Sequence, residues 1–572
     1  MSTDIRASEA RGLGADAGIA VAGERRSTYL PQLALALLTV ACLLPFSGKA
    51  FHIDDPIFIW TAQQITHHPL DPYGFTQTWW NLATPMWQIQ QNPPGAAYYM
   101  ALVGSVAGWS ERALHIGFML PAIVVVLATY RLARRFTGNQ LIAAAATLVA
   151  PAFLVSSTTV MCDVSMLALW MLATVFWVEG LEEPTRPAYL AISGILIAAC
   201  TLTKYFGVSL IPLLFVYSLM RRRGVRGWIA YLAIPVLILG AYEFYTYRLY
   251  GHGLITEAVL HKSYVRETEG PSGRALVGLV FAGGCALPAL TFVSLLWSRR
   301  QLFWGALAGA VLALCFWRGW INLGTVYQYQ SWLHHHLLRV SMQLFFYVGG
   351  GISLLALAIA DFRRNRNALS LLLLLWILGT MFFAVVVNWT VNARSLLPMI
   401  PAVAILIARR LELLKIPSGK PQWAGVAACL LVSLAVSLSV AAGDMATANS
   451  ARTAANYMRE KSRDDLRPPW FEGRWGFEYY MQVFGARPAQ PDGEGARFAD
   501  LVVIPKYNTA LFRFPLKVTG EQTADFDIHT WVTAMNPDAG AGFYFSGWGP
   551  LPFAFGPVPQ QRYLMARVVQ EK

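Results

Sequence analysis

The chain has 572 residues, of which 56% are hydrophobic and 13% are charged, and its formal net charge is +13. Soluble globular domains carry about 25% charged residues, so this composition excludes an ordinary soluble protein and indicates a polytopic membrane protein. The arginines and lysines gather in short loops between apolar runs, so the positive charge follows membrane topology and we expect no nucleic-acid partner. The six cysteines lie in or beside apolar segments, which argues against a disulfide framework.

The N-terminal residues 1–27 are rich in Ala, Gly and Arg without periodicity, and we expect a disordered cytoplasmic tail. No A-x-A-like cleavage site follows the first apolar run, so we interpret that run as a retained span. Thirteen apolar runs could cross about 30 Å of hydrocarbon. They are 30–46, 112–133, 140–158, 161–179, 188–203, 205–220, 228–248, 275–297, 301–318, 341–360, 368–389, 394–410 and 422–441.

A fourteenth apolar run, 94–109, is short and rich in Gly and Ala, and the charge distribution decides its status. If it does not span, every basic cluster falls on the cytoplasmic side, as the positive-inside rule requires. These clusters are Arg25/Arg26, Arg131/Arg134/Arg135, Arg221/Arg222/Arg223/Arg226, Arg299/Arg300, Arg363/Arg364/Arg366 and Arg409/Arg410/Lys415/Lys420. We therefore place 94–109 at the interface, the N-terminus inside and the C-terminal domain outside.

This topology predicts three parts: the tail 1–27, a transmembrane domain 28–441 with a long first external loop 47–111, and an external domain 442–572. Runs such as Leu501–Pro505 suggest a mixed α/β fold for the external domain. The cytoplasmic loops are short and basic, whereas the external loops are long and hold or adjoin all ten histidines. Long loops carry function more often than short ones, so we expect the chemistry on the external face.

Asp54 and Asp55 stand side by side directly after the first span, in a chain with only 32 acidic residues. Two adjacent carboxylates at the mouth of a bilayer are costly to desolvate and are therefore functional candidates. The alternative is that one of them caps the following helix, with Pro56 in its first turn.

Three further charged residues lie at the external ends of predicted spans: Asp163, Lys204 and Arg394. Asp163 could instead cap a helix, Lys204 could snorkel, and Arg394 could be an interfacial anchor. A guanidinium at a membrane surface is also well suited to bidentate phosphate binding. The run His334–His336 is a poor metal site, because three consecutive side chains cannot all point one way.

The order of these motifs resembles that of the polyprenyl-phosphate-dependent glycosyltransferases of the GT-C fold. The most similar subset comprises the bacterial aminoarabinose transferases and the protein O-mannosyltransferases, often grouped as family 39. Between residues 30 and 410 the matching pieces are Asp54-Asp55, Asn92-Pro93-Pro94 with Tyr98, Asp163, Thr203-Lys204 with Gly207, and Arg394 with Pro398. Two residues depart from the family pattern: Asn92 replaces a lysine of the aminoarabinose transferases, and Gly207 is shifted within its motif.

The resemblance implies an inverting transferase that moves a sugar from a polyprenyl-phosphate-linked donor to a hydroxyl of an envelope lipid, glycan or protein. It would work at the external face of a bacterial inner membrane. Asp54 would be the general base, with Asp55 or Asp163 orienting the base or the acceptor. Lys204 and Arg394 would stabilise the phosphate leaving group.

Asn92 and Tyr98 are the remaining substrate-binding candidates that the resemblance implies. No cofactor is required by this chemistry, although carboxylates with nearby histidines would also suit a divalent metal. The main alternative is a transporter or flippase of a lipid-linked or anionic substrate. The sequence has no evident internal repeat and its candidate charges cluster at one surface, which favours the enzyme. A non-catalytic receptor would hardly need so many spans.

Overall fold

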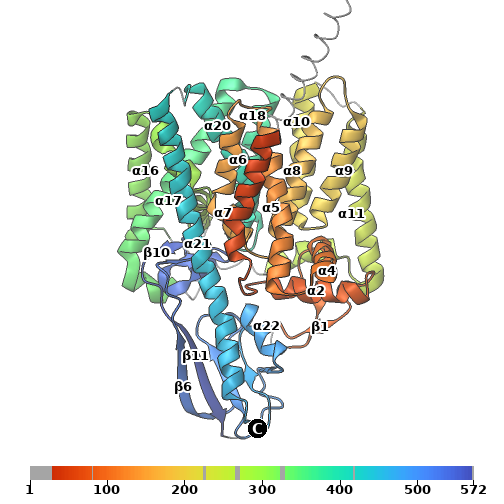
Figure 1. Ribbon diagram of the computed structural model, residues 1–572, viewed down its shortest axis with the longest axis vertical. Helices are drawn as coiled ribbons and strands as arrows, with labels where there is room; N and C mark the ends of the chain where they lie inside the picture. The colour runs from red at the N-terminus through yellow and green to blue at the C-terminus, as the bar shows by residue number, and fades with distance from the viewer. Residues whose placement is uncertain are drawn as a thin grey trace, which may run out of the picture.

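The structure is a computed structural model that describes residues 29–79, 82–222, 227–264, 271–321, 329–416 and 419–569. The predicted tail 1–27 lies outside these residues, and the side chains of His334–His336 are likewise not described. Figure 1 shows a broad bundle of helices, from one end of which a smaller part containing a sheet projects.

The bundle begins with the first span, Tyr29–Phe46, and continues with helices of very different lengths. They are α5 (Glu111–Ala133), α6 (Gln140–Leu148), α7 (Pro151–Ser156), α8 (Cys162–Gly180), α9 (Pro187–Thr201), η2 (Tyr205–Ser209), α10 (Leu210–Arg222), α11 (Ile229–Tyr250), α12 (Leu254–Tyr264), α13 (Pro271–Cys285), α14 (Pro288–Thr291), α15 (Val293–Leu296), α16 (Arg299–Trp317), α17 (Tyr329–Asn365), α18 (Ala368–Phe382), α19 (Ala393–Leu396), α20 (Ile400–Leu413) and α21 (Lys420–Lys461).

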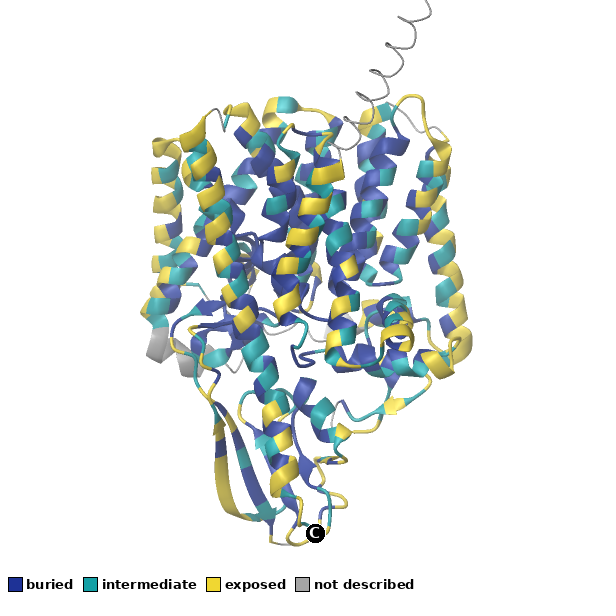
Figure 2. Ribbon diagram, viewed as in Figure 1, coloured by how far each residue is buried: buried dark blue, intermediate teal, exposed yellow. Residues whose placement is uncertain are grey.

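Eight helices within the described ranges are long and apolar enough to cross a membrane, which makes the chain a multi-pass membrane protein. Figure 2 shows exposed residues on the outward faces of the outer helices and buried residues between the helices. Many of the exposed residues are large and apolar, such as Leu237 on α11 and Phe303 on α16, as expected where lipid replaces water. The predicted number of thirteen spans stays a prediction.

Proline explains why some predicted spans are interrupted. The run 140–158 divides into α6 and α7, with Pro151 in the first turn of α7 and Ala150 extended before it. Pro288 also starts a helix, α14, within the run 275–297, although Leu287 before it keeps helical geometry. A proline lacks the N–H that a continuing helix needs, so each of the two prolines begins a new helix.

Two helices of the first loop lie at the end of the bundle from which the sheet projects: α2 (Asp55–His67) and α4 (Gly95–Ala107) (Figure 1). A 13-residue helix is about 20 Å long, well short of a bilayer core. This length agrees with the prediction that 94–109 does not span. A short α3 (Met86–Ile89) and the paired strands β1 (Thr76–Gln77) and β2 (Thr84–Pro85) complete the described part of the loop.

The projecting part is built on α21, whose 42 residues continue from the bundle through position 441 without a break. Its five-stranded sheet has the order β4-β3-β5-β11-β6 and packs against α21 and α22 (Trp475–Val483). The central strand β5 is buried at four of its five positions, which is why its sequence is a continuous apolar run. The strands are β3 (Trp470–Phe471), β4 (Arg487–Pro488), β5 (Leu501–Pro505), β6 (Val518–Phe526) and β11 (Gln561–Val568).

Between β6 and β11 the chain returns to the bundle. Four short strands form two antiparallel pairs there: β7 (Val532–Thr533) with β10 (Ala554–Phe555), and β8 (Met535–Asn536) with β9 (Ala541–Gly542). Their buried residues belong to the same core as the membrane helices. The C-terminal part, residues 442–569, is therefore packed into the helical domain as well as joined to it by α21.

Candidate active site

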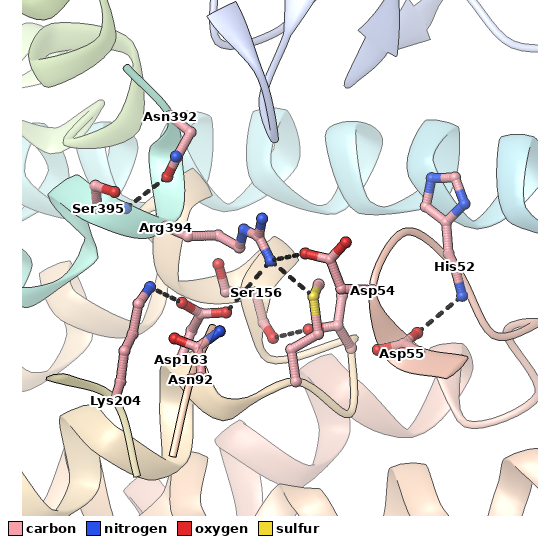
Figure 3. A network of polar contacts seen from close by, with 12 residues as sticks. His52, Asp54, Asp55, Asn92, Ser156, Asp163, Lys204, Asn392, Arg394 and Ser395 are labelled. Atoms are coloured by element: carbon pink, nitrogen blue, oxygen red, sulfur yellow. Dashed lines mark hydrogen bonds and ion pairs between the residues drawn. The ribbon is translucent and has the colours of Figure 1, made fainter. Parts of the chain in front are cut away.

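The four charged residues predicted at the ends of distant spans meet in one cluster (Figure 3). Arg394 Nη1 lies 2.8 Å from Asp54 Oδ2 and 4.0 Å from Asp163 Oδ2. Lys204 Nζ lies 2.5 Å from Asp163 Oδ1. Carboxylate and cation thus alternate along the cluster, in the order Asp54, Arg394, Asp163, Lys204.

The cluster is open to solvent at Asp54 and buried at Asp163. The Asp54 side chain is 31% exposed, whereas that of Asp163 is 1% exposed. Two buried atoms of the cluster have no hydrogen-bond partner among the described residues: Arg394 Nε and Asp163 Oδ2. Unsatisfied polar atoms are rare in protein interiors and point to a missing partner such as a ligand or water.

Asp54 is held by an unusual backbone. The preceding residue, Ile53, has a φ of +50°, a left-handed conformation that a β-branched residue rarely adopts. Asp54 is the N-cap residue of α2, yet its side chain makes no capping hydrogen bond. The capping alternative therefore does not describe Asp54, whose carboxylate faces Arg394.

Asp55 has a different role from its neighbour. It is fully buried, and its two oxygens accept the backbone N–H groups of His52, at 2.9 Å, and Val160, at 3.0 Å. Burial raises its pKa to about 7 against the opposing effects of Lys49 and these hydrogen bonds. Asp55 joins the loop before α2 to the loop before α8, because each of its two carboxylate oxygens accepts a backbone N–H group from one of these loops.

Arg394 comes from the short helix α19. Asn392 caps this helix by accepting a hydrogen bond from Ser395 N at 2.8 Å. The preceding segment is fixed by Arg274, which donates to the carbonyl oxygens of Asn388, at 2.6 Å, and Trp389, at 3.1 Å. The Arg394 guanidinium lies between two carboxylates of opposite charge to its own, those of Asp54 and Asp163.

Lys204 occupies the turn between α9 and η2, and Gly95 packs directly against this turn. Gly95 N donates to Leu202 O at 2.8 Å. A Cβ at Gly95 would lie 2.6 Å from that oxygen and 2.7 Å from Thr203 Oγ1, so only glycine fits. The Asn92-Pro93-Pro94 motif and the Thr203-Lys204 motif, separate in the sequence, are therefore one structural unit.

A groove of about 400 Å³ lies beside this unit. Its lining is mainly apolar and aromatic and includes Tyr98. The remaining lining residues are Pro72, Tyr73, Pro94, Gly95, Leu169, Ala199, Leu202, Thr203, Tyr242, Tyr245, Thr246, Leu249 and Tyr250. Asn92 is not among the lining residues of this groove. Its side-chain amide donates to Gln90 Oε1, and its backbone carbonyl oxygen accepts a hydrogen bond from the Tyr73 hydroxyl.

Sequence reasoning missed a second polar cluster next to the first. Lys49 and Asp444 form a fully buried ion pair at 2.5 Å, and Tyr544 donates a hydrogen bond to Asp444 at 2.7 Å. His52 Nε2 lies 3.7 Å from the same carboxylate, and burial lowers the pKa of His52 to about 4, so its ring is neutral at pH 7. The available signal was Asp444 itself, an acidic residue just past a long apolar run.

Within the described ranges, no group of three or more His, Cys, Asp or Glu residues is placed to hold a metal ion. The prediction that the chemistry needs no cofactor is not tested by this geometry, and it stays a prediction.

Comparison with known proteins shows a resemblance of this chain to glycosyltransferases. The model of the dolichyl-phosphate-mannose-protein mannosyltransferase family matches residues 91–242, about a quarter of the chain. The match confirms the predicted resemblance and the prediction of an enzyme. It contains Asn92, Tyr98, Asp163 and Lys204 and ends before Arg394. No curated protein sequence matches the chain.

Several solved structures are similar at low identity. The Archaeoglobus fulgidus oligosaccharyltransferase, in a complex with Zn and sulfate, has a TM-score of 0.47 at 15% identity over 83% of this chain and 67% of that chain. ArnT from Cupriavidus metallidurans, bound to undecaprenyl phosphate, has a TM-score of 0.41 at 15% identity over 83% of this chain and 92% of that chain. The arabinosyltransferase EmbB from Mycobacterium smegmatis has a TM-score of 0.34 at 14% identity over 86% of this chain and 46% of that chain.

Proposed function

We propose that this protein transfers a sugar from a polyprenyl-phosphate-linked donor to a hydroxyl group of an envelope acceptor, with inversion at the anomeric carbon. The observation that carries the proposal is the alternating cluster of Asp54, Arg394, Asp163 and Lys204 beside an aromatic groove. The cluster brings a carboxylate with access to solvent next to two cations, which are the groups that this reaction requires.

Asp54 is the general base in this proposal. Inverting transfer needs a base that removes the proton of the attacking hydroxyl on the face opposite the leaving group. Of the three candidate carboxylates, Asp54 alone is both substantially exposed and free of backbone hydrogen bonds like those of Asp55. Asp163, buried between the two cations, orients Arg394 and Lys204.

The leaving group is a phosphate, which needs cations rather than a general acid. Arg394 directs Nη1 toward Asp54, while its buried Nε has no partner among the residues that the structure describes and suits a phosphate oxygen. Lys204 uses one of its three N–H donors on Asp163. The prenyl chain of the donor would occupy the adjacent groove, in contact with Tyr98.

The remaining parts of the proposal concern location and cofactor. The arginines at the end of α5, Arg131 and Arg134, lie about 30 Å along the helix from Glu111, which contacts the projecting part. The positive-inside rule then favours an active site on the external face, which would be the periplasmic face of the bacterial inner membrane that the resemblance implies. No metal is part of the mechanism, and the acceptor is a hydroxyl of an envelope lipid, glycan or protein.

The test is transfer of radiolabelled sugar from a polyprenyl-phosphate donor by the purified protein in detergent, with and without EDTA. Asp54→Asn should reduce turnover by about 10²–10⁴-fold, which is the contribution of general-base catalysis, because the amide cannot accept the proton. Arg394→Ala should raise the KM for the donor more than the KM for the acceptor. Full turnover by Asp54→Asn would refute the base assignment, and loss of activity in EDTA would refute the metal-free mechanism.

A further inference from the structure

A segment of the C-terminal part lies directly against the loop that carries Arg394. Ala393 N donates to Phe543 O at 2.8 Å, and Ser546 N donates to Val391 O at 3.0 Å. The Thr390 and Ser546 hydroxyls are 2.9 Å apart. These contacts join residues about 150 positions apart in the sequence, so the Arg394 loop takes its shape from the C-terminal part.

Tyr544 is the side chain of this segment that reaches the site. Its ring lies under the guanidinium of Arg394, with Cζ 5.6 Å from the ring centroid. Its hydroxyl donates to Asp444 Oδ2 at 2.7 Å, and Asp444 pairs with Lys49. Tyr544 is 3% exposed, so the contact with Arg394 is shielded from water.

Lys49 begins the loop that leads to Asp54, and the C-terminal part fixes this loop as well. Ala50 N donates to Asn449 Oδ1 at 2.9 Å, and Phe51 N donates to Tyr480 OH at 2.8 Å. Such fixation accounts for the left-handed Ile53, because strained backbone persists only where its surroundings determine it. The two loops that supply Asp54 and Arg394 are thus both held by the same part of the chain.

We propose that Tyr544 is a positioning residue of the active site: its ring supports the Arg394 guanidinium, while its hydroxyl ties that ring to Asp444, which pairs with Lys49 at the start of the loop that leads to Asp54. This inference rests on the proposed function and deepens it. It assigns part of the donor-phosphate site to the C-terminal segment, at a residue more than 140 positions beyond Arg394.

A shielded cation–π contact has a free energy of up to about 2 kcal/mol, which corresponds to a factor of roughly 10 to 30 in binding. Tyr544→Leu should therefore raise the KM for the donor roughly tenfold, with the KM for the acceptor unchanged and kcat within about threefold of wild type. Tyr544→Phe keeps the ring and loses only the hydroxyl tie to Asp444, so its donor KM should rise, but by less than that of Tyr544→Leu.

The experiment measures kcat and both KM values in the label-transfer assay with the full-length protein. Tyr457→Leu is the matched control, because Tyr457 also lies under a cation, Lys461 Nζ, at 5.6 Å, but on the distal part of α21. It should leave all three constants unchanged. Size-exclusion elution in detergent checks folding, and if Tyr544→Leu elutes abnormally, the unbranched Tyr544→Met takes its place with the same expected result.

Absence of transfer by the wild-type protein would contradict the proposed function itself. With an active wild type, an unchanged donor KM in Tyr544→Leu would overturn the positioning role. A proportional rise of both KM values would also overturn it, since a general structural defect has that effect. Equal losses in Tyr544→Phe and Tyr544→Leu would overturn the role of the ring.

Discussion

Ile53 and Asp55 flank the candidate base, and each carries a physical cost that an ordinary loop would avoid. Ile53 is left-handed, and Asp55 buries a carboxylate. Each cost is of the order of kcal/mol and must be offset by neighbouring contacts. Together they fix the direction in which Asp54 leaves the loop, toward Arg394 2.8 Å away.

Asp55 should make stability depend on pH in a definite direction. Its pKa is raised by burial from 3.8 to about 7, so the folded state holds a proton that the unfolded state releases between these values. The stabilisation is therefore complete below about pH 4 and is lost as pH rises through about 7. Asp55→Asn removes this titration and should flatten that part of the profile of thermal unfolding midpoint against pH.

In Asp55→Asn the side-chain amide N–H₂ replaces one of the two oxygens that accept backbone hydrogen bonds, so it faces a backbone N–H group and that bond is lost. The substitution should therefore cost about 1–3 kcal/mol of stability at pH 4, where both side chains are neutral. The buried Glu472 and Glu478, with pKa values raised to about 7 and about 8, contribute slopes of the same sign. The informative quantity is the difference between the variant and wild-type profiles, and a difference that does not vary with pH would contradict the assignment.

At the scale of elements, the site depends on how closely α4 approaches the turn between α9 and η2. Gly95→Ala would place a methyl group 2.6 Å from Leu202 O, a backbone atom that cannot rotate away. We expect the turn and Lys204 to shift, with a stability loss of about 1–3 kcal/mol and a raised KM for the donor. Gly240→Ala on α11 is the control, because a Cβ there meets nothing within 4 Å; it should be neutral or stabilising. Equal behaviour of the two variants in unfolding and transfer assays would refute the role of α4.

The elements also mark what the sequence allows one to predict. Apolar runs located the helices, and Pro151 and Pro288 were visible signals for the breaks at α7 and α14. The length of α21 was hidden, because its 42 residues pass from an apolar run into a polar one. The pattern of apolar residues shows which stretches face lipid or the protein core, but it does not mark where a continuous helix leaves the bilayer.

The site was predictable to the extent that its residues belong to motifs. Asp54, Asp163, Lys204 and Arg394 stood out as charges at the ends of spans, and the structure brings them together. Lys49 and Tyr544 did not stand out, since their roles depend on contacts with residues at least 100 positions away in the sequence. A single sequence contains no record of such pairings, which arise from how the whole chain packs.

At the scale of the molecule, the Lys49–Asp444 pair fastens the first loop to the helix that carries the C-terminal part. Both side chains are fully buried, so removal of one partner leaves an uncompensated charge, at a cost of about 3–5 kcal/mol. Lys49→Met should therefore lower the thermal unfolding midpoint sharply. The double variant Lys49→Met/Asp444→Leu removes both charges and should recover much of that loss, since apolar replacements of a buried pair are often neutral.

Recovery in stability should not restore catalysis. The double variant lacks the carboxylate that accepts the Tyr544 hydroxyl, and the loop before Asp54 loses its anchor at position 49. Thermal unfolding and sugar transfer, measured on both single variants and the double variant, form a double-mutant cycle for each property. We expect strong coupling of the two positions in stability and persistently low kcat/KM for the donor. Additive stability losses would show that the pair does not act as a unit, and full activity in the double variant would separate the site from the C-terminal part.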